Sequence, residues 1–537
     1  MNKYLSKYLP FTVLASVIVF VVGVRINLLH FPLERDEGEF AYVGQLILKG
    51  IPPYTEAANM KLPGTYYVYA AMMCLFGEST QGIHLGLVLI NLVSSFFLFL
   101  IIKNKFNTIA AIYGTCSFLL LTLNCYTLSF AAHATNFVIL FALMAIYTFL
   151  NSNYNNRLLF LSGILSGLTF MMKQPGILLC LPLIVLLNIE LIRERKQIFI
   201  SVLNKNITFI FGILTPFILF ALYIKSLNAF DTFWFWTFQY ALQYANQVPL
   251  SSAFEIFKKQ YIDIVGGYFL FWIASFMGLI WIIKTQTVKL PVKYFVTSFF
   301  VLSFMAVCVS FQFRPHYFIL WLPIVCILCG LFFSYIHNKL SESVREIALP
   351  LCLILFFVPV IFLQRGYLFN EDVNILSHEI YSLAPFPESV QIADYIKNNT
   401  SEYDYIYVFG SEPQIYFLSE RKAATSQMYL YPLTEIHFYS RIMQEQAINQ
   451  IEYNKPKYIL LTIPVSWEVK NNSERLIFNW LSKYIDLNYE IDGIIDIICT
   501  NFMPKRFNSI YKWGDDAKKY KPISHHKMVL YKRINCQ

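Results

Sequence analysis

One segment constrains the fold of this chain more than any other: residues Phe106 to Asn156 contain no Lys, Arg, Asp or Glu. A membrane-spanning helix needs roughly 20 apolar residues, so this segment has room for two such helices. Across the whole chain 57% of the residues are hydrophobic and only 14% are charged, whereas an ordinary soluble domain carries about 25% charged residues. The sequence therefore predicts an α-helical, polytopic membrane protein.

Charge-poor windows of suitable length recur along the first two thirds of the chain. With roughly 20 residues needed for each membrane helix, they predict about eleven spans. The windows lie near residues 9–30, 82–102, 106–123, 127–150, 158–173, 175–191, 206–224, 264–283, 294–312, 316–336 and 347–364. Membrane lipids are thus the expected surroundings. The net charge of +9 forms no basic stripe on a polar face, so a nucleic-acid partner is not expected.

The distribution of Lys and Arg predicts the orientation in the membrane. If the N-terminus is cytoplasmic, the loops on its side carry more Lys and Arg than the loops on the other side, as the positive-inside rule requires. The loop 31–81 and everything after Leu363 then lie outside. We expect a multi-pass protein of the plasma (inner) membrane with a cytoplasmic N-terminus.

The chain changes character near Gln364, where charged residues become frequent. Alternating apolar runs at Tyr405–Phe409 and Tyr458–Ile463 predict strands. Helical patterns alternate with them at Ser389–Asn398, Glu435–Glu452 and Ser473–Ile485. The sequence thus predicts a membrane domain over residues 1–365 and a soluble, extracytoplasmic α/β domain over residues 366–537. The polar turn after the first strand, with Glu412 and Gln414, is a candidate for acceptor binding.

The first predicted outer loop is unusually acidic. From Glu34 to Glu39 five of six residues are charged, and the apolar spacing that follows predicts a short helix at the membrane surface. In a structural interpretation Asp36 caps this helix and Glu39 completes a capping box. Arg35 then pairs with Glu34. In a functional interpretation an outward-facing carboxylate takes a proton from an acceptor hydroxyl or amine.

Three motifs in this loop carry a resemblance. Arg35-Asp-Glu-Gly38 is followed by Gly50-x-Pro-Pro-Tyr54 and by Lys61-x-Pro-Gly64. Together they resemble the first extracytoplasmic loop of the GT-C superfamily, in particular the bacterial branch of the dolichyl-phosphate-mannose protein mannosyltransferase family. That branch includes the transferases that put aminoarabinose on lipid A. The resemblance covers the membrane half and is strongest over residues 9–190.

The resemblance implies a GT-C-like membrane domain and an inverting sugar transfer from a polyprenyl-phosphate-linked donor to an extracytoplasmic acceptor. It places the catalytic base at Asp36, with Glu37 as the next residue of the family's Asp-Glu pair. Lys61 matches the family's phosphate-handling lysine loosely. Arg35 and Gly38 fit the broader bacterial subgroup, so the lipid A acceptor is not carried over. A protein, lipid or glycan acceptor stays open.

Further candidates for donor binding lie in other predicted outer turns. Lys173, before Pro175, is similar to a Lys-Gln turn of the family, and Arg314 and Tyr317 resemble its Arg-x-x-Tyr turn. Cations at these places either hold the carrier phosphate or anchor the helix ends at the lipid headgroups. The predicted substrate-binding residues are Arg35, Lys61, Lys173, Arg314, His316 and Tyr317.

Two further sets of residues near the outer face allow a purely structural interpretation. His133 and Asn136 are expected to form hydrogen bonds between helices. Aromatic residues of the outer loop 226–263 either line the entrance for the isoprenoid or form an interfacial belt. These aromatic residues are Trp234, Trp236, Tyr240 and Tyr244.

The sequence predicts no cofactor and no metal. Cys326-x-x-Cys329 has zinc-like spacing, but it lies in a charge-free apolar window without a second ligand pair. Two other functions remain as alternatives. A flippase or transporter of the lipid carrier needs broken helices and mid-membrane charges, which the sequence lacks. An O-antigen ligase or polymerase relies on Arg and His in a large late loop, and Arg314 and His316 resemble such residues only weakly.

Overall fold

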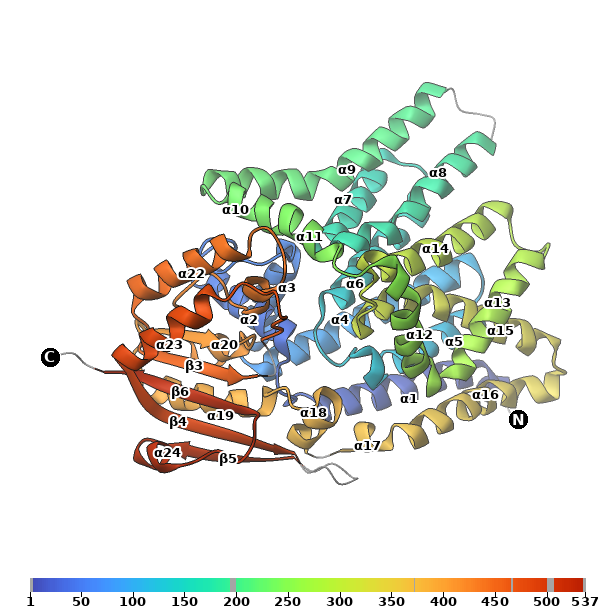
Figure 1. Cartoon of the computed structure of the whole chain (residues 1–537). Coiled ribbons are helices and arrows are strands. Elements are labelled where there is room, and N and C mark those ends of the chain that lie inside the picture. The colour runs from blue at the N-terminus through green and yellow to red at the C-terminus, as the bar shows by residue number, and fades with distance from the viewer. Residues whose placement is uncertain (1–2, 194–198, 371, 465–466, 500–506, 535–537) are drawn as a thin grey trace.

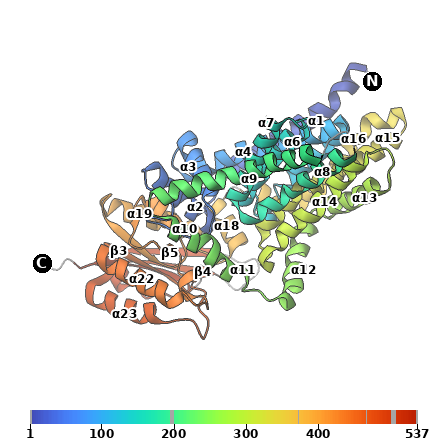
Figure 2. The same ribbon diagram turned by 90° about the horizontal axis from the view of Figure 1, so that it is seen from above.

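The molecule is an elongated helical bundle with a sheet domain at one end (Figure 1). The computed structural model describes residues 3–193, 199–370, 372–464, 467–499 and 507–534. The N-terminus lies at the far end of the bundle from the sheet, in both views (Figure 2). That the N-terminus and the C-terminal domain lie on different sides of a membrane stays a prediction, and so does the assignment of the cytoplasmic side.

Every predicted membrane window coincides with a helix. These helices are α1(Lys3–Asn27), α4(Thr80–Lys105), α5(Thr108–Leu121), α6(Ala134–Leu150), α7(Asn156–Met172), α8(Leu181–Arg193), α9(Phe199–Ser226), α13(Phe269–Lys284), α14(Leu290–Cys308), α15(Leu322–Lys339) and α16(Glu342–Leu363). Among the described residues, five helices are individually long and apolar enough to cross a membrane, and a sixth span forms if α12(Leu250–Gly266) and α13 count as one bent span. The chain is an integral membrane protein; the count of about eleven spans stays a prediction.

Small residues let the bundle helices pack closely. α7 and α9 approach at Gly163 and Gly212, where a Cβ on Gly163 would lie 2.9 Å from the Gly212 Cα. Membrane helices lack a hydrophobic driving force toward one another, so such close van der Waals contact is their main source of association.

The window predicted at 127–150 begins late, because residues 122–133 form an irregular segment before α6. Its short turn η1(Cys125–Thr127) begins at Asn124, whose side chain accepts a hydrogen bond from the Tyr126 amide. Asn124 also donates to the Ile264 carbonyl and accepts from Gln364. These long-range bonds satisfy polar groups that a continuous helix would leave unpaired, and they place His133 directly before α6.

The loop after α1 forms two helices, α2(Arg35–Leu48) and α3(Pro63–Phe76). The expected short helix is therefore present, but its cap differs from the prediction. Its residues Glu37–Leu46 are all buried in the fold, and its position at a membrane surface stays a prediction. Glu34 is the N-cap and accepts from the Glu37 amide, and the Glu37 side chain completes the capping box. The predicted cap at Asp36 and box partner at Glu39 are wrong. A cap two residues earlier leaves both of these carboxylates free for other contacts.

The C-terminal region holds one mixed six-stranded sheet of order β2-β1-β3-β6-β4-β5. Its strands are β1(Tyr405–Phe409), β2(Lys422–Ala423), β3(Tyr458–Ile463), β4(Tyr489–Cys499), β5(Phe507–Trp513) and β6(Lys527–Arg533). β1 pairs in parallel with β2 and β3, and β6 lies antiparallel between β3 and β4. The predicted small sheet domain is confirmed, and both predicted strands have the expected bounds. The domain boundary near residue 365 stays a prediction.

Helices cover the sheet and connect it to the bundle. They are α18(Val373–Tyr381), α19(Phe386–Asn398), α20(Gln414–Ser419), α22(Ser440–Asn454) and α23(Leu476–Asn488). α20 packs on α2, where a Cβ on Gly38 would lie 2.7 Å from the Gln414 Cα. Only glycine fits at this contact. The Ala423 amide of β2 also donates to the Tyr42 hydroxyl of α2, so the sheet domain rests directly on the acidic loop.

Candidate active site

A cavity of about 280 Å³ opens beside the first turn of α2. Segments from six parts of the chain form its wall: α2, the loop before α3, the residue before α6, the turn η2(Gln174–Leu179), the wide helical turn η3(Phe235–Tyr240) with α11(Ala241–Ala245), and η5(Pro315–Trp321). Its polar lining includes Asp36, Lys61, His133, Lys173, Tyr244, His316 and Tyr317. The fold thus brings most of the predicted site residues into one cavity.

Asp36 is the acidic group of this cavity. Its Oδ1 accepts a hydrogen bond from Lys61 Nζ at 3.0 Å, and its Oδ2 lies 4.0 Å from His133 Nδ1. Burial alone would raise the pKa of Asp36, but the Lys61 ammonium and His133 outweigh burial and lower the pKa to about 2. The carboxylate is therefore ionised and points into the cavity.

The loop before α3 holds Lys61 in place. The Tyr54 hydroxyl donates to the Lys61 carbonyl at 2.7 Å, and the Asn59 side chain donates to Glu39 Oε2 at 2.9 Å. Lys61 Nζ also lies 5.5 Å from the Phe40 ring centroid. Because its carbonyl and the nearby Asn59 side chain are both bonded, the Lys61 ammonium meets Asp36 in a defined position.

Glu39 is a buried carboxyl that the sequence analysis did not assign to the site. It accepts hydrogen bonds from the Tyr66 hydroxyl at 2.5 Å and from the Tyr429 hydroxyl at 2.9 Å. Burial raises the pKa of Glu39 to about 7. Its position three residues after Asp36, on the same side of α2, was the available signal. Tyr429 belongs to the sheet domain, and no motif near it in the sequence predicted its contact with Glu39.

Glu37 points away from the cavity. Its Oε1 accepts from the Ala132 amide at 2.6 Å and lies 3.2 Å from His84 Nε2. Burial would raise the pKa of Glu37, but the pairing with His84 outweighs it and lowers the pKa. The predicted neighbour of the base thus joins α2 to α4 and to the segment before α6, and it does not face a substrate.

Arg35 also lies outside the cavity. Its Nε donates to the Ser411 carbonyl at 2.6 Å, and its guanidinium lies 3.6 Å from a Glu412 carboxylate oxygen. The predicted Arg35–Glu34 pair is therefore replaced by a contact with the sheet domain. This contact also buries the turn after β1. Glu412 and Gln414 are fully buried, and the Gln414 side chain donates to Ser389 Oγ. The burial of both side chains argues against an acceptor site at this turn, which stays a prediction.

Lys173 and Tyr317 face Asp36 from the opposite wall. Lys173 Nζ lies 3.7 Å from the Tyr317 ring centroid. Burial and the nearby Lys61 ammonium lower the pKa of Lys173 well below its usual value. Arg314 is exposed at the start of η5, beside Tyr244. Lys61 and Lys173 line the cavity together with Asp36, whereas Arg314 is not among the residues that line it. Basic side chains at these places suit an anionic ligand.

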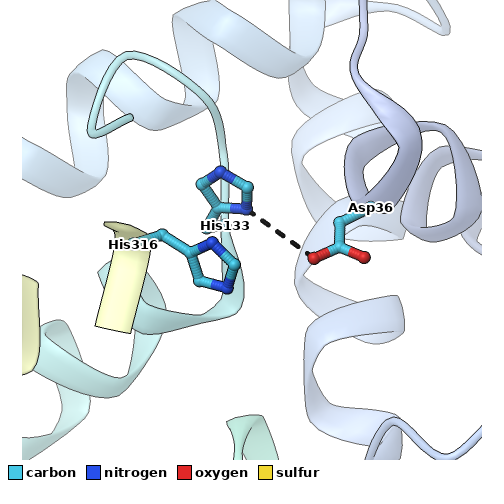
Figure 3. A group of neighbouring side chains, drawn as sticks. All are labelled: Asp36, His133 and His316. Atoms are coloured by element: carbon cyan, nitrogen blue, oxygen red, sulfur yellow. Dashed lines mark ion pairs between the residues drawn. The ribbon is translucent and has the colours of Figure 1, made fainter. Parts of the chain in front are cut away.

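Two histidines complete the wall between Asp36 and η5. The rings of His133 and His316 are stacked, with centroids 4.1 Å apart and planes inclined by 15°. Figure 3 shows both rings facing the Asp36 carboxylate. The predicted bond between His133 and another helix is wrong, because neither ring nitrogen of His133 has a hydrogen-bond partner among the described residues. Asn136 bonds back to the Ala131 carbonyl.

Of the four outer-loop aromatics, Tyr244 lines the cavity. The Tyr240 hydroxyl donates to Glu435 Oε2 of the sheet domain at 2.7 Å. Trp236 is buried against Tyr240, and Trp234 is partly exposed and stacks with Phe230. The loop therefore serves the cavity and the domain contact with different residues.

Comparisons with known proteins agree with this architecture. The sequence profile of the dolichyl-phosphate-mannose-protein mannosyltransferase family matches residues 60–226. No curated protein sequence matches the chain significantly. The fold is that of the GT-C glycosyltransferases, which confirms the resemblance seen in the sequence.

Two solved structures illustrate this. ArnT from Cupriavidus metallidurans bound to undecaprenyl phosphate aligns with a TM-score of 0.61 at 14% identity, covering 97% of each chain. The Archaeoglobus fulgidus oligosaccharyltransferase tethered to an acceptor peptide aligns with a TM-score of 0.54 at 11% identity, covering 95% of this chain and 74% of that one. The chain thus resembles the aminoarabinose transferases over nearly its whole length.

Proposed function

We propose that this protein is a glycosyltransferase that moves a sugar from a polyprenyl-phosphate carrier to an extracytoplasmic acceptor. The observation that carries the proposal is the cavity in which one ionised carboxylate, Asp36, faces Lys61 and Lys173. The fold shared with ArnT bound to undecaprenyl phosphate and the profile match support a lipid-phosphate donor.

The proposed reaction is a single displacement. Asp36 Oδ2 takes the proton from an acceptor hydroxyl or amine while that group attacks the anomeric carbon. The bond between this carbon and the carrier phosphate breaks as the new bond forms, so the configuration inverts. Lys61 and Lys173 hold the departing phosphate, and Arg314 reaches it from the rim.

The ion pair of Asp36 with Lys61 gives the donor a second role. With a pKa near 2, the paired carboxylate is a weak base. A donor phosphate attracts the Lys61 ammonium and weakens its bond to Asp36, which raises the pKa of Asp36 toward the range in which general bases work well. Donor binding would therefore activate the base before the acceptor reacts.

One wall of the cavity is apolar and suits the first isoprene units of the carrier. It is formed by Phe238 of η3, Leu242 of α11 and Val309, which directly follows α14. Leu242 is 62% exposed, as expected for a side chain that meets lipid. The wide turn η3 is of the kind often found beside functional sites.

We further propose that this cavity faces outward from the plasma membrane and that the N-terminus is cytoplasmic, as the positive-inside rule predicts. Cysteines introduced at the exposed positions Tyr453 and Thr287 test this orientation. A membrane-impermeant thiol reagent should label position 453 of intact cells and leave position 287 unlabelled. The reverse pattern would contradict both the orientation and the site of reaction.

The function itself is tested by mass spectrometry of envelope glycans, glycolipids and glycoproteins. A deletion strain should lose one sugar modification, which returns with the wild-type gene and with the Glu56→Gln variant. Glu56 belongs to the same loop but forms an exposed pair with Lys422, so it is a matched control. Unchanged glycans after deletion would contradict a transferase and favour a carrier flippase, whereas loss of whole polymers would favour a ligase or polymerase.

A further inference from the structure

The Asp36, His133 and His316 side chains come from three distant parts of the chain and approach one another on the cavity wall (Figure 3). One ligand-type atom from each lies within 4.8 Å of the others. Asp36 Oδ2 and His133 Nδ1 are 4.0 Å apart. Asp36 and His133 therefore meet through the carboxylate oxygen that Lys61 does not occupy.

His133 shows that this cluster lacks something. Its side chain is 3% exposed, and neither ring nitrogen has a hydrogen-bond partner among the described residues. Leaving a buried polar group unpaired costs about 1–3 kcal/mol, so native structures nearly always supply a partner. The imidazole faces the cavity, where a ligand can reach it.

We propose that Asp36, His133 and His316 bind a divalent transition-metal ion, with zinc as the best fit. Two imidazoles and one carboxylate are the ligand set of catalytic zinc sites, which keep a fourth position open for water or substrate. Here the open position faces the cavity. The sequence could not suggest this set, because its members have no common spacing motif, and the proposal departs from the expectation of no metal.

The three groups must move modestly to bind an ion. Zinc bonds of about 2.0–2.2 Å place ligand atoms roughly 3.4 Å apart in a tetrahedral site, so the widest separation has to shrink by about 1.4 Å. The stacked rings also have parallel in-plane lone pairs. Binding an ion therefore requires the half-buried His316 and Asp36 side chains to rotate so that the three ligand atoms converge.

Charge makes metal binding depend on the donor. Lys61 bonds the second Asp36 oxygen and repels a cation in its present position. A lipid phosphate neutralises Lys61 and Lys173 and adds negative charge beside the ion, so phosphate and metal should each raise the affinity for the other. This role rests on the proposed function: at the open position the ion would lower the pKa of an acceptor hydroxyl. With Oδ2 on the ion, the hydroxyl proton passes to Asp36 Oδ1, the oxygen that Lys61 leaves for the phosphate.

The test uses the full-length protein in detergent, purified with a tag that contains no histidine. After EDTA treatment and desalting, zinc affinity and stoichiometry are measured by titration and by elemental mass spectrometry, for wild type, His133→Asn and His316→Asn. His30→Asn is the matched control, since His30 is an exposed histidine in the segment between α1 and α2. We expect about one zinc per chain in wild type and His30→Asn, and at least a tenfold loss of affinity in both cavity variants.

Adding undecaprenyl phosphate should tighten zinc binding in wild type only. Thermal unfolding and undecaprenyl phosphate binding of the apo variants confirm that they are folded. Wild type without stoichiometric zinc, or cavity variants that bind zinc as tightly as wild type, would overturn the site. Zinc binding that ignores undecaprenyl phosphate would overturn its coupling to the donor. Transfer that needs Asp36 but no zinc would leave the proposed function intact and overturn the role of the metal in it. Zinc binding together with transfer that survives Asp36→Asn would support the metal site and overturn the proposed function.

Discussion

Two polar clusters lie on opposite sides of α2, and they have opposite characters. In the cavity, Asp36, Lys61, Lys173 and His133 face open space, and the His133 nitrogens lack a hydrogen-bond partner among the described residues. In the turn after β1, Glu412 and Gln414 are buried against Arg35 and Ser389. Gln414 Oε1 has no hydrogen-bond partner among the described residues either, but this residue does not line the cavity. Polar groups that are satisfied within the fold stabilise it, whereas those facing a cavity are available to a ligand.

This contrast divides the expected effects of mutation. Changes in the turn should lower stability and leave donor affinity nearly unaltered in whatever protein folds. Changes in the cavity should lower transfer or donor affinity with little effect on stability.

Gly38→Ala should have the largest effect on stability. Its new Cβ would lie within 2.7 Å of Gln414 Cβ and Cα, so α20 must shift away from α2. Overpacking of this kind costs up to about 3 kcal/mol, which thermal unfolding will report. Gly23→Ala is the control, since nothing lies within 4 Å of the added atom. Equal unfolding temperatures for the two variants would show that the turn is not a tight contact.

Lys61→Gln and Lys173→Gln should raise the donor KM by about 10- to 100-fold each, because a hydrogen bond to a charged group contributes about 1.5–3 kcal/mol. Steady-state kinetics with varied donor concentration measures this. Lys422→Gln, which removes only an exposed ion pair with Glu56, should leave the KM unchanged. An unaltered KM in both cavity variants would mean that the phosphate binds elsewhere.

Tyr429→Phe sharpens the boundary between the two clusters. The Tyr429 hydroxyl donates to Glu39 Oε2 and to the Arg35 carbonyl, and its loss should destabilise the protein by about 1 kcal/mol. Since Tyr429 does not line the cavity, the donor KM should stay within about twofold of wild type. A KM raised as strongly as in Lys61→Gln would make the sheet domain part of the donor site.

A smaller, pH-dependent effect is expected at His378 in the sheet domain. Burial would lower the pKa of His378, but its bond to Glu388 outweighs burial and raises the pKa. The pair therefore adds stability below pH 6.5, the ordinary histidine pKa, and this contribution is lost as pH rises through the folded value. Thermal unfolding of wild type and His378→Gln should differ more at pH 5.5 than at pH 8.5. A difference that grows with pH would contradict this pairing.

Local patterns predicted the elements that local physics controls. The strands at Tyr405–Phe409 and Tyr458–Ile463 have the expected bounds because each is a short apolar run, although both are buried on both faces and not alternately. The predicted start of α6 was too early. Residues before α6 form an irregular segment in which Asn124 bonds to distant residues. In the site, the family resemblance pointed to Asp36 and Lys61. The positions of His133 and Tyr429 depend on packing between segments far apart in the chain, and no spacing along the sequence reveals them.

The central claim is that Asp36 is the base of an active site in the bundle cavity. Purified Asp36→Asn should be folded, should bind undecaprenyl phosphate like wild type within a few fold, and should transfer sugar at least 100-fold more slowly, since general bases contribute about 10²–10⁴-fold. Asp36→Asn removes the charge but keeps the shape. Transfer above about a tenth of the wild-type rate would contradict the claim.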